Sequence, residues 1–397
     1  MLSPSPLSLF CALLLCLPLA IVFTITTPTT ISSQNSSNHT HRTPLVILPQ
    51  PPPPPIPKDD ELLFRVAARV SRRPTSNRKL AFMFLATMPL PSAPLWELYF
   101  NNTNKNLYNI YVHADPSFEY DLPFSGVFTQ RVIPSQSSLR FTPTLASAAR
   151  RLLAHALLHD SGNYMFAMLS PSCIPIHSFN FTYGTLMKSN KSFIEILENE
   201  PGSYDRWAAR GETAMLPEVK LEDFRIGSQF WVLTRKHARL VVSDRWIWNK
   251  FNKPCRNYDT CYPEENYFST LIHMRDPRGC VPATLTHVDW SISSGGHPRE
   301  YQESEVGPEL IFKLRNDKPR YGDDGNNGSD LAVMKGRHPF LFARKFSRGS
   351  IKALLSIAND VIFKDLGCSR WHLLYVWVKL MKELGKNPVF FVSHLLQ

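Results

Sequence analysis

The arrangement of apolar and polar residues along the chain predicts strands that alternate with helices. Six compact apolar runs have the length and composition of strands, at 79–87, 107–113, 164–169, 227–233, 284–290 and 331–334. Apolar positions recur with helical spacing over 59–73 and 145–159, and a basic helix is expected from Arg235. This alternation predicts an α/β fold with a mostly parallel sheet flanked by helices.

Polar side chains follow two of the predicted strands. Asp115 comes just after the second run, and residues 170–173 come just after the third. The carboxyl ends of parallel strands meet at one edge of a sheet, and such sheets bind ligands beyond that edge. We therefore expect Asp115 and residues 170–173 to lie at a ligand-binding edge.

The first 57 residues follow a different pattern. They hold 12 of the 33 prolines and one charged side chain, Arg42, although the whole chain has a formal net charge of +11. Residues 7–25 form an uncharged apolar run, long enough to cross a bilayer core of roughly 30 Å. A membrane signal-anchor is the favoured interpretation. A cleaved signal peptide is the alternative, but no basic residue precedes the run and no small-x-small site follows it.

These features predict five parts of the chain. They are a short cytoplasmic tail at 1–6, a transmembrane signal-anchor at 7–25, a Pro-rich stem at 26–58, a lumenal domain at 59–365 and an atypical C-terminal extension at 366–397. Within the stem, prolines 51–55 are expected to form a stiff polyproline II spacer. A lumenal body does not meet nucleic acid, so nucleic-acid binding is excluded as the reason for the positive charge.

Sequons and cysteines agree with a lumenal location. Glycosylation sequons occur at Asn35, Asn38, Asn101, Asn180, Asn190 and Asn327. Five cysteines follow the apolar run, and among them Cys255 and Cys261 enclose a short loop that an oxidising compartment would allow to close as a disulfide. The odd number leaves at least one thiol free or paired between chains. No cysteine or histidine spacing typical of a zinc site occurs.

The segment CYPEENYFSTLI at 261–272 carries the first candidate chemistry. Glu264 and Glu265 follow Pro263 at an expected helix start. Acidic residues are favoured in the first turn of any helix by its dipole, which is one explanation of this pattern. The functional interpretation makes one of the two carboxylates a general base beside a cleft.

The segment RHPFLFARKFSR at 337–348 carries the second candidate chemistry. Basic residues alternate there with apolar ones. The pattern suits a solvated cationic loop or a segment that binds anionic lipid. It also suits a diphosphate-binding site in which Lys345 supplies a compact positive charge and a nearby arginine donates two parallel hydrogen bonds. Farther upstream, Trp290 ends a predicted strand, where a tryptophan serves either as core or as a stacking surface for a sugar.

Seven stretches occur in the order typical of one known family: LAFMFLAT, NIYVHADPS, YMFAMLSPSCIPI, FRIGSQFWVLTRKHA, CYPEENYFSTL, THVDWS and FLFARKFS. Together they resemble the core-2/I-branching β-1,6-N-acetylglucosaminyltransferase family, glycosyltransferase family 14, and most closely its plant branch. The resemblance extends over about 79–362 and fades near Phe363.

This resemblance implies a GT-A-like (Rossmann-like) fold and an inverting transfer from a UDP-sugar, with no cofactor and no metal. It agrees with the lack of any D-x-D triplet, through which a metal usually holds the leaving diphosphate, so that basic side chains are expected to neutralise it. It also implies a single-pass type II glycoprotein of the Golgi membrane, with the catalytic domain in the lumen.

The same resemblance assigns roles to individual residues. Glu265 is expected to deprotonate the acceptor hydroxyl, and Lys345 to bind the donor diphosphate. Animal members have a second basic residue at the diphosphate, on the strand that corresponds to 330–334 here. No arginine occurs on that strand, so Arg344 or Arg337 is expected to take its place. The remaining expected contacts are to the uridine, from Asp115, and to the acceptor, from Glu195, Arg206 and Trp290.

The predicted function is transfer of a sugar, with N-acetylglucosamine as the leading choice, from a UDP-sugar to a hydroxyl of a glycan or glycoprotein. One alternative is a glucuronosyltransferase of the same family. The other is a non-catalytic, membrane-anchored glycan-binding protein on the same fold. The acceptor, the linkage and the oligomeric state are left open.

Overall fold

The computed structural model describes residues 56–57, 59–74, 77–120, 125–292, 297–323 and 338–365. The chain divides into two compact units, Met1–Pro54 and Pro55–Gln397, and every described residue belongs to the second. The predicted tail, signal-anchor and extension therefore lie outside the described residues, as do nearly all of the stem, the expected strand at 331–334 and Arg337. Within the described ranges, no helix has both the length and the apolar character needed to span a membrane.

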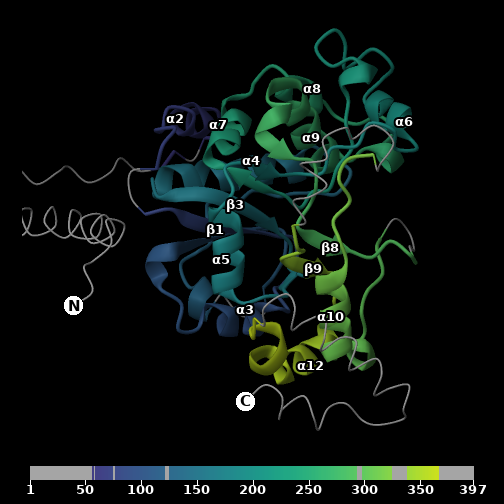
Figure 1. Ribbon diagram of the computed structural model, residues 1–397. Coiled ribbons are helices and arrows are strands. Elements are labelled where there is room, and N and C mark those ends of the chain that lie inside the picture. The colour runs from purple at the N-terminus through teal and green to yellow at the C-terminus, as the bar shows by residue number, and fades with distance from the viewer. Residues whose placement is uncertain are drawn as a thin grey trace, which may run out of the picture. The chain divides into compact units, whose positions relative to one another are not determined.

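A mixed six-stranded sheet forms the centre of the domain, in the order β2-β1-β3-β6-β5-β7 (Figure 1). β1 pairs in parallel with both β2 and β3, β5 pairs in parallel with β7, and β6 is antiparallel to its two neighbours. The predicted mostly parallel sheet is confirmed, whereas the reversed direction of β6 was not foreseen. The strands are β1 (Lys79–Ala86), β2 (Tyr108–Ala114), β3 (Asn163–Leu169), β5 (Ser192–Phe193), β6 (Val232–Thr234) and β7 (Cys280–Val281).

A second sheet of three short strands was also not foreseen. In it β9 (Phe342–Arg344) lies between β4 (Ile174–Pro175), which is antiparallel to it, and β8 (Thr286–Val288), which is parallel. Val288 is aligned with Arg344 at the end of the parallel pair. This pairing places the expected diphosphate-binding segment beside the strand that leads to Trp290.

Helices cover both faces of the large sheet (Figure 1). Helices α2 (Asp60–Ala67), α4 (Thr144–His159), α7 (Arg235–Ser243) and α9 (Pro263–Arg275) share one core with one face, and α3 (Ala93–Phe100) and α5 (Phe179–Met187) share another core with the opposite face. The helices α10 (Pro308–Asn316) and α12 (Ile351–Ser356) form a third core with the small sheet. Two short helices, α6 (Ser203–Ala208) and α8 (Trp248–Phe251), lie near the start of α9 in Figure 1.

Alternate residues of β1 enter different cores. Ala81 and Met83 belong to the core with α4, whereas Phe82 and Phe84 belong to the core with α3. Because both faces are covered, the strand is apolar along nearly its whole length, which is why it was recognisable as a buried run. Phe82 is fully buried and its ring contacts six other aromatic rings, those of Trp96, Tyr99, Phe100, Tyr108, Phe179 and Phe342.

Three predicted elements are shorter than their patterns suggested, and one of them, the strand expected over 284–290, is regular only as β8. The helix expected over 59–73 ends at Ala67, and two carbonyls beyond its end accept hydrogen bonds from guanidinium groups, that of Ala68 from Arg239 and that of Ser71 from Arg235. The strand expected over 227–233 is regular only as β6. Its first residue, Gly227, instead donates its backbone N–H to the carbonyl of Glu265 in α9.

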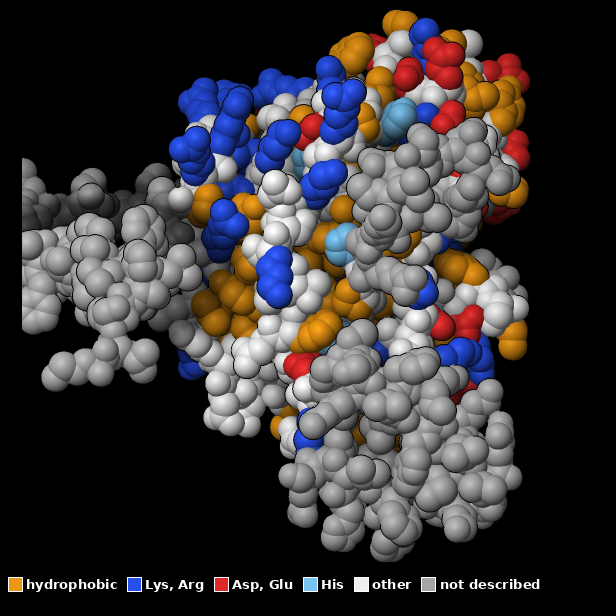
Figure 2. All heavy atoms as spheres, viewed as in Figure 1, with side chains coloured by type: hydrophobic (Ala, Val, Ile, Leu, Met, Phe, Trp, Pro, Cys, Tyr) orange, Lys and Arg blue, Asp and Glu red, His pale blue; other side chains and the backbone are white. Residues whose placement is uncertain are grey.

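One surface of the domain is strongly basic. Lys and Arg side chains gather over α2 and α7, at the upper left of Figure 2. The exposed residues of this region include Arg69, Arg72, Arg73 and Lys236. None of these four lines the cavity described below, so part of the positive charge lies away from it.

The aromatic cluster gives a test of the fold. Phe82→Ala removes a fully buried ring, so the free energy of unfolding should fall by about 3–5 kcal/mol, measured by urea denaturation. Leu62→Ala is the matched control, because Leu62 is 44% exposed and its loss should change stability by no more than about 0.5 kcal/mol. Equal effects from the two substitutions would contradict the assigned core.

Candidate active site

A cavity of about 1090 Å³ lies beyond the carboxyl ends of the central strands. Thr87, which follows β1, and Ser170, which follows β3, form one wall, and Thr286 of β8 and Arg344 of β9 form another. The first turn of α9 closes a third side with Glu264 and Glu265. A cavity of this size accommodates a ligand as large as a nucleotide sugar.

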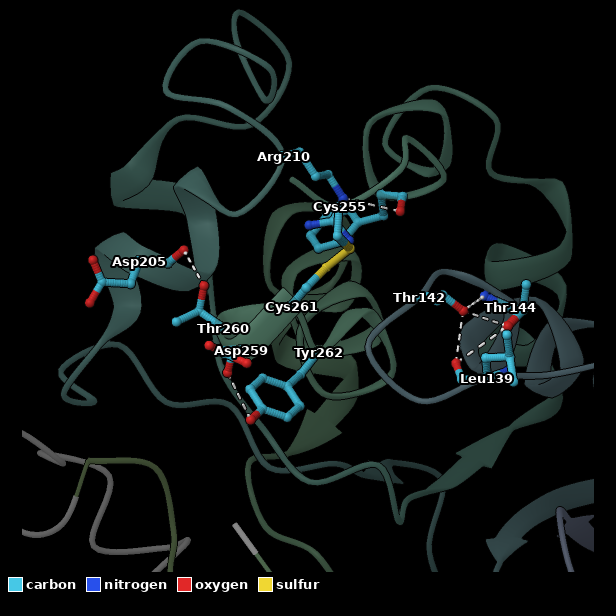
Figure 3. The surroundings of a disulfide bond; sticks show 11 residues. Leu139, Thr142, Thr144, Asp205, Arg210, Cys255, Asp259, Thr260, Cys261 and Tyr262 are labelled. Carbon is cyan, nitrogen blue, oxygen red and sulfur yellow. Dashed lines mark hydrogen bonds between the residues drawn. A yellow bond between two sulfur atoms is a disulfide. The ribbon is translucent and has the colours of Figure 1, made fainter. Parts of the chain in front are cut away.

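The start of α9 is fixed by the chain just before it. Pro263 occupies the first turn, where a missing backbone N–H costs nothing. Cys255 and Cys261 form a disulfide, which confirms the pairing considered from the sequence (Figure 3). The enclosed loop is tied to its surroundings by hydrogen bonds from the backbone of Arg256 to the carbonyl of Ala209 and from the hydroxyl of Thr260 to that of Asp205.

Close backbone packing joins α9 to the segment at Gly227. The N–H of Gly227 donates to the carbonyl of Glu265 at 2.9 Å. A Cβ on Gly227 would lie 2.2 Å from both the carbonyl oxygen of Glu195 and the hydroxyl of Ser269, which bond each other at 2.8 Å. Only glycine fits here, and its presence brings the backbones of Glu195 and Glu265 together.

Glu265 is held in an ion pair at the cavity wall. Its Oε2 lies 2.7 Å from a guanidinium nitrogen of Arg206, and the two side chains are 28% and 24% exposed. The guanidinium also lies over the ring of Tyr262, 4.5 Å from its centre, and that ring contacts Phe141. Stacking and pairing together fix the direction of the Glu265 carboxylate, which stays within reach of a bound ligand.

The adjacent carboxyls hold protons more strongly than usual. Burial, assisted by the charge on Glu265, raises the pKa of Glu264 to about 8, and Glu264 is only 6% exposed. Burial also raises the pKa of Glu195 to about 7, with the charges on Glu200 and Glu265 adding to the effect and Arg320 opposing it. Glu264 is therefore mostly protonated at pH 7 and is less suited than an ionised carboxylate to act as a base.

Cationic groups gather at the end of β9. Burial lowers the pKa of Arg344, whose guanidinium lies 4.8 Å from the ring centre of Phe230. The ammonium of Lys345 lies 3.5 Å from a carboxylate oxygen of Glu300. Two further basic side chains of this wall, Arg140 and His297, were missed from the sequence because each stands in an irregular loop with no motif around it.

Six of the predicted site residues line this one cavity: Glu195, Arg206, Glu265, Trp290, Arg344 and Lys345. They come from segments up to 150 positions apart in the chain, as from Glu195 to Lys345. Trp290 is 56% exposed at the rim, so it is accessible and not a core residue. Arg337 lies outside the described residues.

Asp115 is the predicted residue that does not line the cavity. It is fully buried, and its Oδ1 accepts hydrogen bonds from Ser117 while its Oδ2 accepts two from Ser138. Burial favours a higher pKa for Asp115, but these hydrogen bonds outweigh it and the pKa lies below its usual value. The carboxylate anchors the loop that forms the cavity wall, so this geometry gives no support to the expected contact with uridine.

No group of three or more His, Cys, Asp and Glu side chains is arranged to hold a metal ion within the parts of the chain that the structure describes. That finding covers the described ranges only, so a transfer without a metal stays a prediction.

Two comparisons with known proteins bear on the site. The sequence profile of the Core-2/I-Branching enzyme family matches residues 80–315. The chain is also 31% identical over 318 residues to Glycosyltransferase BC10 of Oryza sativa subsp. japonica, an alignment that covers 72% of this chain and 78% of the rice protein. The profile match includes Glu195, Arg206, Glu265 and Trp290 and ends before Arg344 and Lys345.

The raised pKa of Glu264 gives a test of stability against pH. The native state keeps the Glu264 proton to about pH 8, whereas the unfolded chain loses it near its ordinary value, so this carboxyl reduces stability increasingly as the pH rises between the two. Glu264→Gln removes this decrease of stability at high pH, because glutamine does not ionise. The variant should be as stable as wild type near pH 4 and more stable at pH 8 by on the order of 1–3 kcal/mol, measured by chemical denaturation.

Glu212→Gln is the matched control, because Glu212 is exposed. Its stability relative to wild type should not change with pH. A Glu264→Gln variant that parallels wild type from pH 4 to pH 8 would show that Glu264 is ionised in the native state.

Proposed function

The chain belongs to the core-2/I-branching enzyme family and is a glycosyltransferase, and we propose that it transfers a sugar from a UDP-sugar to a hydroxyl of a glycan or glycoprotein. One observation carries the proposal: a single cavity holds an oriented carboxylate, Glu265, and a cationic wall with Arg344 and Lys345. A base and an anion-binding wall are the two parts that such a transfer requires.

In the proposed reaction Glu265 accepts the proton of the acceptor hydroxyl. The acceptor oxygen attacks the anomeric carbon from the face opposite UDP, so a new glycosidic bond forms as the bond to the diphosphate breaks. The configuration at that carbon is thereby inverted. The electron pair of the broken bond stays with UDP, and the negative charge that develops is stabilised by Lys345 and Arg344, with Arg337 as a further candidate.

The acceptor is proposed to lie on the side of the cavity formed by Glu195, Arg206 and Trp290. The accessible indole of Trp290 suits stacking against the apolar face of a sugar ring. Arg206 already contacts Glu265, so an acceptor hydroxyl that bonds both would be guided toward the base. N-acetylglucosamine is the proposed donor sugar, and glucuronic acid is the alternative that a donor panel distinguishes.

We also propose a Golgi location, as a single-pass type II membrane protein with a lumenal catalytic domain. The Cys255–Cys261 disulfide supports an oxidising compartment. Three sequon asparagines among the described residues, Asn101, Asn180 and Asn190, are exposed and therefore accessible to a glycan. The proposed anchor at 7–25 lies outside the described residues.

Replacement of the proposed base tests the mechanism. Glu265→Gln keeps the shape of the side chain but does not accept a proton, so kcat should fall by about 10²–10⁴-fold while UDP still binds. The assay is release of UDP from a panel of UDP-sugars, followed by calorimetry with UDP. Glu212→Gln, an exposed glutamate, should behave as wild type.

The same assay tests the alternatives. Turnover of Glu265→Gln at the wild-type rate would remove Glu265 as the base. EDTA should leave the wild-type rate unchanged, and a strict requirement for manganese would contradict stabilisation of the diphosphate by side chains alone. Binding of glycan with no release of UDP from any donor would point to a non-catalytic glycan-binding protein.

A further inference from the structure

Arg140 and His297 meet at the cavity although they are far apart in the sequence. One guanidinium nitrogen of Arg140 lies 2.8 Å from Nε2 and 3.4 Å from Nδ1 of His297, and both side chains line the cavity. Guanidinium groups only donate hydrogen bonds, so the ring nitrogen of His297 that accepts from Arg140 carries no proton. The structure therefore contains a neutral imidazole bonded to a permanent cation at the wall where Arg344 and Lys345 lie.

Burial and the charges around His297 together favour its neutral form. Partial burial lowers the pKa of His297, and the positive charges of Arg140, Lys345 and Arg344 lower it further, while the carboxylate of Glu300 opposes them. Glu300 also lies within reach of Lys345, so its charge is shared with another cation. A histidine among three cations and one carboxylate gains a proton readily only when further negative charge arrives.

The guanidinium of Arg140 is held by a braced loop. Asp115 bonds the backbone and the hydroxyl of Ser138, and Thr144 accepts a hydrogen bond from the backbone of Leu139. The hydroxyl of Thr142 closes the turn by donating to the carbonyl of Leu139 (Figure 3). These hydrogen bonds hold the backbone that carries Arg140, and the guanidinium itself lies over the ring of Phe141, 4.7 Å from its centre.

We propose that Arg140 and His297 form a proton-linked binding site for the diphosphate of the donor. This proposal rests on the proposed function, because it takes the ligand to be a nucleoside diphosphate. When the diphosphate enters, Arg140 donates to its oxygens, and His297 takes up one proton from solvent and donates to the same anion. Binding is thereby coupled to the uptake of a proton that leaves again with the ligand.

The exchange of partners is energetically reasonable. A hydrogen bond from Arg140 to an anionic phosphate oxygen is about twice as strong as one to a neutral acceptor. Once the ring of His297 no longer accepts a hydrogen bond from Arg140, the freed ring nitrogen is able to accept a proton. The negative charges of the ligand then offset the three neighbouring cations, which removes the electrostatic reason for the imidazole to remain neutral.

Calorimetry with UDP on the full chain tests the proposal. UDP binding is measured between pH 5.5 and 8.0 in buffers of different ionisation enthalpy, which reports the protons taken up. The terminal phosphate of UDP titrates near pH 6 itself, so the proton uptake of the variants is compared at the upper end of this pH range, where that phosphate is ionised in both free and bound UDP. Wild type should take up more protons than His297→Gln, by up to about one, and its affinity should fall more steeply as the pH rises.

Two further variants sharpen the test. Arg140→Met should weaken UDP binding by about tenfold or more. His273→Gln is the matched control, since His273 is a half-buried histidine of α9 that does not line the cavity, and it should bind UDP with the wild-type proton uptake. His297 is exposed, so its replacement should leave the melting temperature unchanged, which separates a binding defect from misfolding.

The outcomes are distinguishable. Equal proton uptake by wild type and His297→Gln, with UDP bound tightly by both, would overturn the proton-linked site and leave the proposed function intact. Wild-type affinity in Arg140→Met would likewise overturn it. If wild type itself does not bind UDP, then this proposal and the proposed function both fail.

Discussion

The contact between Gly227 and α9 is the constraint on which the cavity depends. No side chain fits between Gly227 and the carbonyl of Glu195, so the backbones of two strand-end segments and one helix pack directly against each other. This brings Glu195, Glu264 and Glu265 to one wall, where three negative charges would repel each other. The protein limits the repulsion in two ways, because burial raises the pKa of two of the carboxyls and Arg206 pairs with the third.

Charges of the other sign gather at the end of β9. Burial and the cations Arg140, Lys345 and Arg344 lower the pKa of His297, which favours its neutral form. These cations would attract the negatively charged diphosphate proposed to bind there. Their local gathering, more than the total charge of +11, agrees with the nucleotide-sugar donor that the family implies.

Local patterns predicted β1, β2, β3 and α4, because these elements are long and largely buried, but missed the two-residue strands β5 and β7. The antiparallel β6 and the small sheet depend on pairings between distant segments, which no local period reveals. The same limit applies to the site. Glu265 and Lys345 stand in motifs that resemble those of a family, but the meeting of Arg140 with His297 is visible only after folding. Asp115 was correctly placed just beyond a strand. Its carboxylate, however, is buried by hydrogen bonds from Ser117 and Ser138 and does not face the cavity.

The order of the two walls along the chain has a consequence for biosynthesis. The acidic wall is complete once α9 has been made, since Glu195, Arg206 and Glu265 all precede Arg275. The cationic wall is finished only when β9 pairs with β8, because Arg344 and Lys345 are added some seventy residues later. A nascent chain therefore holds the Glu265 carboxylate before it is able to form the complete cationic wall.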